Sequence, residues 1–229
     1  MAIAPTHCLP GLCPARSYPL FKAKEESECF QRQCCGPSRE FTLDTFMRHP
    51  TNPEEGMGPL LTSSFRPFKC CEFMCFNRPE MFVKGADGRQ IGHVYNPFTC
   101  CSMDVDVEPP VDTRLDLGEV NKEATVAGAS AWPYKISATC CQIGVWCQCP
   151  CGDCRIISFD VLDQSGAVVG EVQKVFAGCC KEAVDVSNFA VRFPAGATWF
   201  QKATMINTVI LMDFLWFERQ NNNNNNGGH

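Results

Sequence analysis

The chain has 229 residues, of which 45% are hydrophobic, enough for one domain with a sizeable core or for two small ones. Its formal net charge of -5 excludes a broad basic surface that would attract nucleic acid. The chain has 18 cysteines, and its N-terminus lacks the charged start and apolar core of a secretory signal peptide. We therefore expect a reducing compartment, in which the thiols are available for acyl chains or metals.

Short antiparallel strands are predicted for most of the chain. Residues 1–20 are expected to be an irregular N-terminal segment, and one domain is expected from residue 21 to residue 218. Apolar and polar residues alternate clearly in three stretches, which begin at Phe41, Met103 and Phe189. Helical periodicity is nearly absent before residue 197. Strands of this kind close most economically into a barrel or a sandwich.

Two segments, residues 81–101 and 157–180, look like copies of one hairpin unit. Gly88 in the first copy and Gly166 in the second lie in turn sequences between alternating apolar residues, which predicts β-hairpins. Each copy ends in an adjacent cysteine pair and is preceded by its own cysteine cluster. The repeat is too long for a solenoid, and we interpret it as two copies of one meander.

Ten of the cysteines form five adjacent pairs. Because neighbouring side chains on a strand point to opposite faces, we expect each pair to present one thiol inward and one outward, and to chelate metals poorly. A denser run of four cysteines could hold zinc: Cys147, Cys149, Cys151 and Cys154. Four ligands this close in the sequence are strained unless another thiol joins. We favour a buried or lipid-facing cysteine loop over this zinc site.

One helix is predicted, at about residues 198–217, and a disordered polar tail follows at residues 219–229. The helix is apolar nearly all round, and its strongly polar residues after the first turn are Asn207 and Asp213. Its apolar stretch would measure about 22 Å, against about 30 Å for a hydrocarbon core. Asp213 at the bilayer centre would cost about 2.5 to 3.5 kcal/mol. We therefore favour a helix buried among strands over a transmembrane helix.

Several motifs together resemble the phospholipid scramblase family. They are CCGPSREFTL (34–43), FRPFKCCEFMCF (65–76), hairpins with IG-x-V and VG-x-V, and DVSNFAVRFP followed by the apolar helix and FLWFE. The resemblance covers about residues 20–218. It implies a mainly β, tubby-like fold: a closed twelve-stranded antiparallel barrel around a central hydrophobic C-terminal helix. Family members carry two further strands before CCGPSR, so we expect that this chain either lacks the opening hairpin or replaces it with residues 1–20.

The resemblance further implies calcium-stimulated, bidirectional movement of phospholipids between leaflets by a palmitoylated lipoprotein. The residues that match the acylated run are Cys70, Cys71 and Cys75. Aromatic and basic residues surround them: Phe68, Phe73, Phe76, Arg66, Lys69 and Arg78. Two acyl chains would make attachment stable, and each basic residue adds about 1 kcal/mol near anionic lipid. The alternative is that these cysteines are small buried hydrophobes.

The calcium site that the resemblance implies is degraded. The family's EF-hand-like loop corresponds to residues 185–196 here, and calcium needs six to eight oxygen ligands. Only Asp185, with Ser187 or Asn188, offers side-chain oxygens, and the apolar positions that follow alternate as in a half-buried strand. We expect any calcium binding to be weak.

Two functions remain open at this point. In the first, the helix enters the bilayer, and Asn207 and Asp213 help headgroups across. In the second, the protein is a peripheral, S-acylated lipid-binding or signalling protein whose helix stays buried and which moves no lipid. Catalytic motifs are absent and His93 lies between apolar neighbours, so we do not expect an enzyme. The expected partner is a phospholipid membrane at the cytoplasmic face of the plasma membrane. Nuclear import is not carried over, because residues 170–183 hold only two basic residues.

Overall fold

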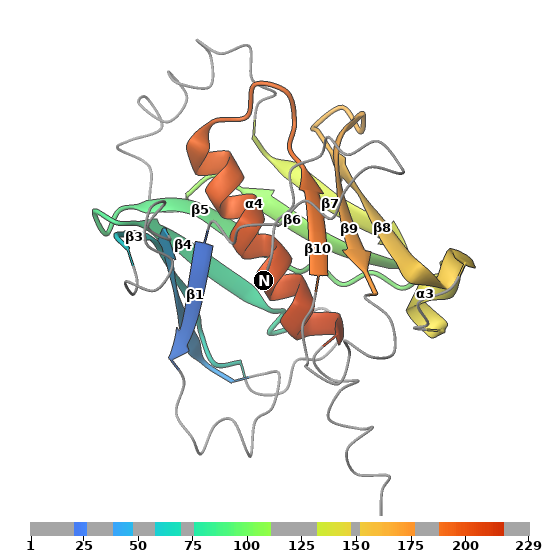
Figure 1. The fold of residues 1–229 in the computed structure, drawn as a ribbon, viewed down its shortest axis with the longest axis horizontal. Helices are drawn as coiled ribbons and strands as arrows, with labels where there is room; N and C mark the ends of the chain where they lie inside the picture. Colours follow the sequence, from blue (N-terminus) through green and yellow to red (C-terminus); the bar gives the residue numbers. More distant parts are fainter. Residues whose placement is uncertain are drawn as a thin grey trace, which may run out of the picture.

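The computed structural model of the chain describes residues 21–26, 39–47, 58–69, 76–110, 132–147, 152–176 and 188–217. Within them, ten strands form one antiparallel sheet in which each strand pairs with the next along the chain (Figure 1). The strands are β1 (Phe21–Glu26), β2 (Phe41–Met47), β3 (Leu60–Arg66), β4 (Glu80–Gly85), β5 (Gln90–Tyr95), β6 (Ser102–Glu108), β7 (Tyr134–Thr139), β8 (Ile156–Leu162), β9 (Val168–Val175) and β10 (Asn188–Arg192). The helical elements are α3 (Ile143–Trp146), the 3-10 turn η2 (Gly152–Arg155), α4 (Trp199–Met212) and the π-helical turn η4 (Asp213–Phe217).

The mainly β class with a C-terminal helix agrees with the sequence pattern, but closure of the barrel is not seen. Among the residues described, β1 pairs only with β2 and β10 only with β9, so these two strands are the edges of an open sheet. The sheet has ten strands in this part of the chain, and not the twelve of the barrel that the resemblance implies. The strands nevertheless curve around one helix (Figure 1).

Both predicted hairpins are confirmed. Gly88, between β4 and β5, has a φ of 81°, and Gly166, between β8 and β9, has a φ of 80°. This left-handed conformation suits glycine, because it has no Cβ. In the second turn the Asp163 carboxylate accepts hydrogen bonds from the backbone N–H groups of Ser165 (2.8 Å) and Ala167 (3.0 Å). The turn residues therefore fix the register of the two strand pairs.

Helix α4 is the centre of the fold. The Thr198 hydroxyl accepts a hydrogen bond from the Gln201 backbone N–H, and the Gln201 side-chain oxygen accepts one from the Thr198 backbone N–H, which forms a capping box. The helix contacts β4, β5 and β6, and the aromatic rings of η4 continue the packing onto other strands. These ring pairs are Phe214 with Phe41 of β2, Trp216 with Phe159 of β8, and Phe217 with Phe189 of β10. The prediction of a buried helix among strands therefore agrees with its packing.

Gly92 of β5 shows how closely the helix approaches the sheet. A Cβ atom at this position would lie 2.3 Å from the Thr204 hydroxyl and 2.6 Å from its methyl group. Both distances are shorter than atoms tolerate, so only glycine lets α4 lie this close to β5. Gly170, the corresponding glycine of the second hairpin, is equally constrained, because its Cβ would lie 2.5 Å from the Arg192 carbonyl.

Candidate functional site

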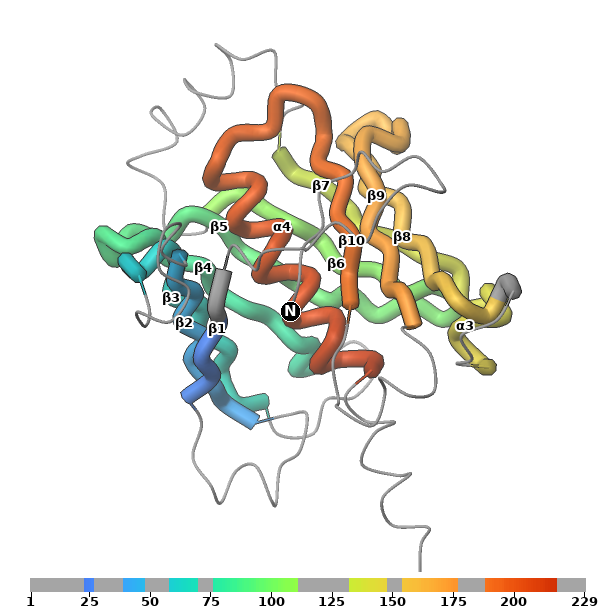
Figure 2. Tube along the Cα trace, in the orientation of Figure 1, coloured from blue at the N-terminus to red at the C-terminus, as the bar shows by residue number. Residues whose placement is uncertain are grey.

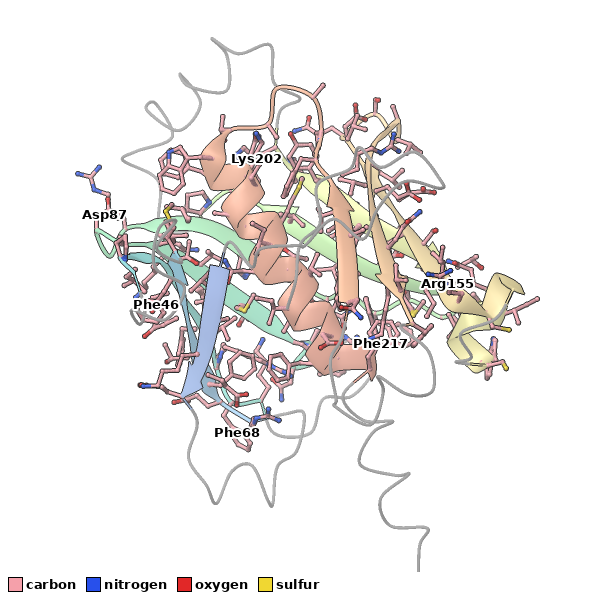
Figure 3. The ribbon with its side chains drawn as sticks, in the orientation of Figure 1. Phe46, Phe68, Asp87, Arg155, Lys202 and Phe217 are labelled. Carbon is pink, nitrogen blue, oxygen red and sulfur yellow. The ribbon has the colours of Figure 1, made fainter. Side chains whose placement is uncertain are left out.

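The connections between strands divide into two sets, because a meander turns at alternate ends of the sheet (Figure 2). The connections that follow β1, β3, β5, β7 and β9 start and return at one end, which we call the thiol-rich end. In the sequence, 16 of the 18 cysteines fall within these five connections, and the other two precede β1. Figure 3 places Phe68, Arg155 and Phe217 along this end and Phe46, Asp87 and Lys202 away from it. The cysteines are therefore segregated by topology.

Of the segment expected to carry acyl chains, the structure describes only the borders. Cys70, Cys71 and Cys75 lie outside the described residues. On either side of them, Phe68 is 43% exposed and Phe76 is 72% exposed. Aromatic rings are usually buried, so two exposed rings that bracket one short cysteine run mark a surface of unusual apolar character.

The expectation that basic residues near this run face anionic lipid is wrong for the three described cations. Arg66 is buried, with its guanidinium 5.8 Å from the centre of the Phe41 ring. The Lys69 ammonium lies 2.8 Å from a Glu80 carboxylate oxygen. Arg78 donates hydrogen bonds to the backbone carbonyl and side-chain oxygen of Asn96. Their charges hold neighbouring strands and connections together, which residue spacing alone could not reveal.

Four cysteines meet where β6 begins and β7 ends. The Cys140 N–H donates to the Cys101 carbonyl at 3.3 Å, which brings the pair Cys100-Cys101 beside the pair Cys140-Cys141. All four are free thiols, three of them exposed. Cys100-Cys101 lies in a bend and Cys140-Cys141 in a turn, outside the strands, so the prediction that adjacent thiols point to opposite faces of a strand does not apply to these two pairs.

The surroundings of two of these thiols, Cys101 and Cys140, favour the protonated form. A hydrogen bond from Cys100 and the proximity of Cys100, Cys140 and Cys141 raise the pKa of the Cys101 thiol above its usual value. Desolvation, followed by the hydrogen bond with Cys141, raises the pKa of the Cys140 thiol. If one of the neighbouring thiols were ionised, its negative charge would repel a second thiolate, so ionisation of the second thiol is disfavoured.

The structure describes two of the four cysteines that could hold zinc. Cys147 is exposed and Cys154 is half-buried, whereas Cys149 and Cys151 lie outside the described residues. In the parts of the chain that the structure describes, no three histidine, cysteine, aspartate or glutamate side chains are placed to share a metal ion. Two of the four hypothetical zinc ligands can thus be placed, and they do not form a site by themselves.

The degraded calcium loop runs into a strand. Asp185 and Ser187 lie outside the described residues, and Asn188 is the first residue of β10. Phe189 and Val191 are buried, which confirms the half-buried strand predicted from their alternation. Residues 188–192 pair with β9 throughout, so the backbone groups on the β9 side of this strand are used in the sheet.

The two polar residues of the helix tie it to the sheet. Asn207 is 1% exposed, and its side-chain amide donates to the Thr62 hydroxyl at 3.1 Å and to the Ala203 carbonyl at 2.9 Å. An Asp213 carboxylate oxygen lies 3.0 Å from the Lys174 ammonium on β9. Lys174 is buried and its ammonium lies 4.1 Å from the centre of the Phe217 ring. Both polar residues therefore act as internal attachments between helix and sheet.

Among the helices that the structure describes, none has the length and apolarity of a membrane span.

Sequence reasoning missed a charged cluster around His93. Its Nδ1 lies 3.1 Å from Glu108 of β6, and its Nε2 lies 3.1 Å from Glu80 of β4. Partial burial would raise the pKa of Glu80, but hydrogen bonds from Lys69 and His93 outweigh this effect and lower it. The signal that could have found the cluster is strand register, since His93 pairs directly with Glu108 and with Phe82, two residues from Glu80.

Comparison with known proteins gives one consistent result. The family model described as Scramblase matches residues 15–219. The chain is 30% identical to phospholipid scramblase 1 of Homo sapiens over 203 residues, which cover 87% of this chain and 53% of that protein. It is 29% identical to phospholipid scramblase 2 of Bos taurus over 204 residues, which cover 87% of this chain and 57% of that protein. The chain thus spans about half the length of the curated relatives it matches. No solved structure matches it.

Proposed function

The chain belongs to the scramblase family, and from this premise we propose that it is a scramblase-like protein that moves phospholipids in both directions between the leaflets of a membrane. We further propose that it is attached to the cytoplasmic face of the plasma membrane by its thiol-rich end. The observation that carries the proposal is the topological segregation of 16 of 18 cysteines to that end.

Attachment through acyl chains is the proposed role of Cys70, Cys71 and Cys75. In each reaction the cysteine sulfur attacks the carbonyl carbon of a long-chain acyl thioester, the new thioester forms, and the donor's thiol leaves with the proton. The exposed rings of Phe68 and Phe76 support this role, because they would bring the intervening segment to the acyl-chain boundary. Because Arg66, Lys69 and Arg78 interact with other groups of the protein, attachment should depend on the acyl chains more than on anionic lipid.

The alternative, a peripheral protein that moves no lipid, is supported by the burial of α4. Exposing the helix would break the contacts of Asn207 with Thr62 and of Asp213 with Lys174. Breaking a fully buried ion pair costs about 3 to 5 kcal/mol, and this pair, in which Asp213 is 32% exposed, should cost less but still a sizeable part of the stability of a typical domain. We therefore propose that α4 stays in place while lipids move. If α4 stays in place and no lipid moves, the protein has the peripheral function.

Calcium is proposed to act only through weak binding at Asp185 with Ser187 or Asn188. Titration calorimetry of the full chain should show no stoichiometric calcium site tighter than about 10 µM, since a sensor-grade loop needs six or more oxygen ligands. A tighter site would contradict this part of the proposal.

Reconstitution into liposomes tests the function. The 229-residue chain is incorporated into vesicles that contain a fluorescent phospholipid in both leaflets, and dithionite is added to quench the outer leaflet. Lipid movement predicts that quenching proceeds beyond the outer-leaflet fraction seen in protein-free vesicles. Quenching that stops at that fraction, while the protein remains bound, would instead support the peripheral alternative.

A further inference from the structure

A small apolar projection lies at the thiol-rich end, away from the 70–75 run. Helix α3 forms the outer end of the molecule beyond β7 and β8 (Figure 1). Its Trp146 is 79% exposed and its Ile143 is 56% exposed, and Phe98 of the neighbouring connection is 45% exposed. Residues 96–101 and 140–147 contain no charged side chain, and the nearest charged residues of these connections, Asp153 and Arg155, lie in η2, which packs against α3. We call this surface the α3 tip.

The exposure of the tip is built into the fold. The Trp146 indole N–H donates to the Cys140 carbonyl at 2.7 Å, which holds the ring in place. The Gln142 side chain, just before α3, donates to the Ser158 carbonyl at 2.7 Å and accepts from the Ser158 N–H at 2.9 Å. Gly144 faces inward, and a Cβ there would lie 3.0 Å from the Ile157 side chain. Buried contacts on one side therefore fix Ile143 and Trp146 on the other.

The thiols around the tip do not oppose entry into an apolar medium. Cys100, Cys101, Cys140 and Cys141 lie at its base, where contact with Cys100 raises the pKa of Cys101 and desolvation raises the pKa of Cys140. A protonated cysteine behaves as a small hydrophobe, whereas a thiolate would add a desolvation cost. The tip thus combines an indole ring, aliphatic and aromatic side chains and thiols.

We propose that the α3 tip inserts into the interfacial layer of a phospholipid bilayer, as a second contact that does not require acylation of Cys70, Cys71 or Cys75. The inference rests on the proposed function, because it assumes that the protein works at a membrane. A bilayer fits better than a protein partner for two reasons. Helix α3 projects at the outer end of the molecule (Figure 1), so a protein partner would need a matching hollow, and the tip shares its end of the sheet with Phe68 and Phe76, so one flat surface can meet both. Amphipathic rings such as indole favour the headgroup boundary.

The test uses the unacylated 229-residue chain and phosphatidylcholine–phosphatidylserine vesicles in a flotation assay. The tip variant is Ile143→Ser with Trp146→Ser. The matched control is Val168→Ser with Trp199→Ser, which removes one aliphatic and one indole side chain of 56% and 53% exposure at the opposite end of the sheet. Transfer of one large apolar side chain out of water changes partitioning by about tenfold or more, so the tip variant should bind vesicles about tenfold more weakly than wild type. The control variant should bind as wild type does.

A second measurement locates the tip directly. Lipids brominated near the headgroup should quench part of the tryptophan fluorescence of the wild type, and this part should disappear in Trp146→Phe and persist in Trp199→Phe. Thermal melts of all variants check that they fold.

The outcomes separate the two proposals. Equal vesicle binding by the tip variant and wild type would overturn the α3 tip inference and leave the proposed function standing. A wild type that binds no vesicles, acylated or not, would overturn the proposed function itself and the inference with it. Concentration-dependent dimers of the wild type that the tip variant lacks would also overturn the inference, because a second copy of the chain would then cover the tip.

Discussion

The ion pair between Lys174 and Asp213 allows a test of whether the helix must leave the sheet. Lys174 is 6% exposed at its side chain, whereas Asp213 is 32% exposed, so the two partners differ in access to water. Replacing Asp213 with alanine leaves a buried ammonium without this carboxylate. Replacing Lys174 with methionine leaves a carboxylate that water can still reach. The two substitutions should therefore have unequal costs.

The magnitudes follow from this asymmetry. Removing one partner of a fully buried pair costs about 3 to 5 kcal/mol. The aromatic rings around Lys174, with its ammonium 4.1 Å from the Phe217 ring centre, retain part of its stabilisation, so we expect about 2 to 3 kcal/mol for Asp213→Ala. Lys174→Met keeps most of the buried volume and should cost less than about 1 kcal/mol.

Urea unfolding followed by tryptophan fluorescence measures both values, and the liposome assay then links them to function. If lipid movement requires release of α4, Asp213→Ala should accelerate it, because the attachment at the end of the helix is weaker. Under our proposal, in which the helix stays in place, the rate should not increase. Equal destabilisation by both substitutions would refute the burial argument, and faster lipid movement in Asp213→Ala would refute the fixed helix.

Three further predictions concern stability. Gly92→Ala should cost about 2 to 3 kcal/mol in urea unfolding, because its Cβ would lie 2.3 Å from the Thr204 hydroxyl; a cost near zero would show that the helix can move away. Burial, followed by neighbouring carboxylates, raises the pKa of Asp106 above 3.8, so its charge destabilises the fold at pH values above the folded pKa. Asp106→Asn should therefore raise the melting temperature at pH 7 but not at pH 3, and a gain that is the same at both pH values would contradict this reasoning. The pKa of Glu80 is lowered from 4.5, so its contribution is present at neutral pH and is lost as the pH falls through the folded pKa; Glu80→Gln should lower the melting temperature at pH 7 and converge with wild type in acid, as a pH series of thermal melts would show.

The local features of the fold could be predicted because they are written in short stretches of sequence. Apolar residues at alternate positions, such as Phe189 and Val191, predict a strand with one buried face. Gly166 predicts a turn whose backbone conformation is strained for other residues. The apolar run before the C-terminus reports a helix that must be covered, and the structure covers it with strands on several sides. Each of these signals depends on residues close together in the chain.

The features that could not be predicted depend on pairing between distant segments. His93 reaches two carboxylates only because β4, β5 and β6 are neighbours in one register. The sequence shows no partner for the basic residues beside the 70–75 run, yet Lys69 pairs with Glu80 and Arg78 donates to the Asn96 carbonyl, because the sheet brings these groups together. The adjacent cysteines were treated as strand residues, although Cys100-Cys101 and Cys140-Cys141 lie just outside the strands, where side chains no longer alternate.

The direction of α4 connects the thiol-rich end to the helix. The helix begins at Trp199, after the last strand has ended at the opposite end of the sheet, and η4 finishes at Phe217 near the thiol-rich end (Figure 3). The Lys174–Asp213 pair lies at that same end, since Lys174 is the last residue but one of β9. A bilayer that contacts the thiol-rich end therefore lies close to the C-terminal attachment of the helix and far from its N-terminal cap. Any effect of the membrane on the helix should thus act first on the Asp213 carboxylate, and the capping box of Thr198 should be the last contact affected.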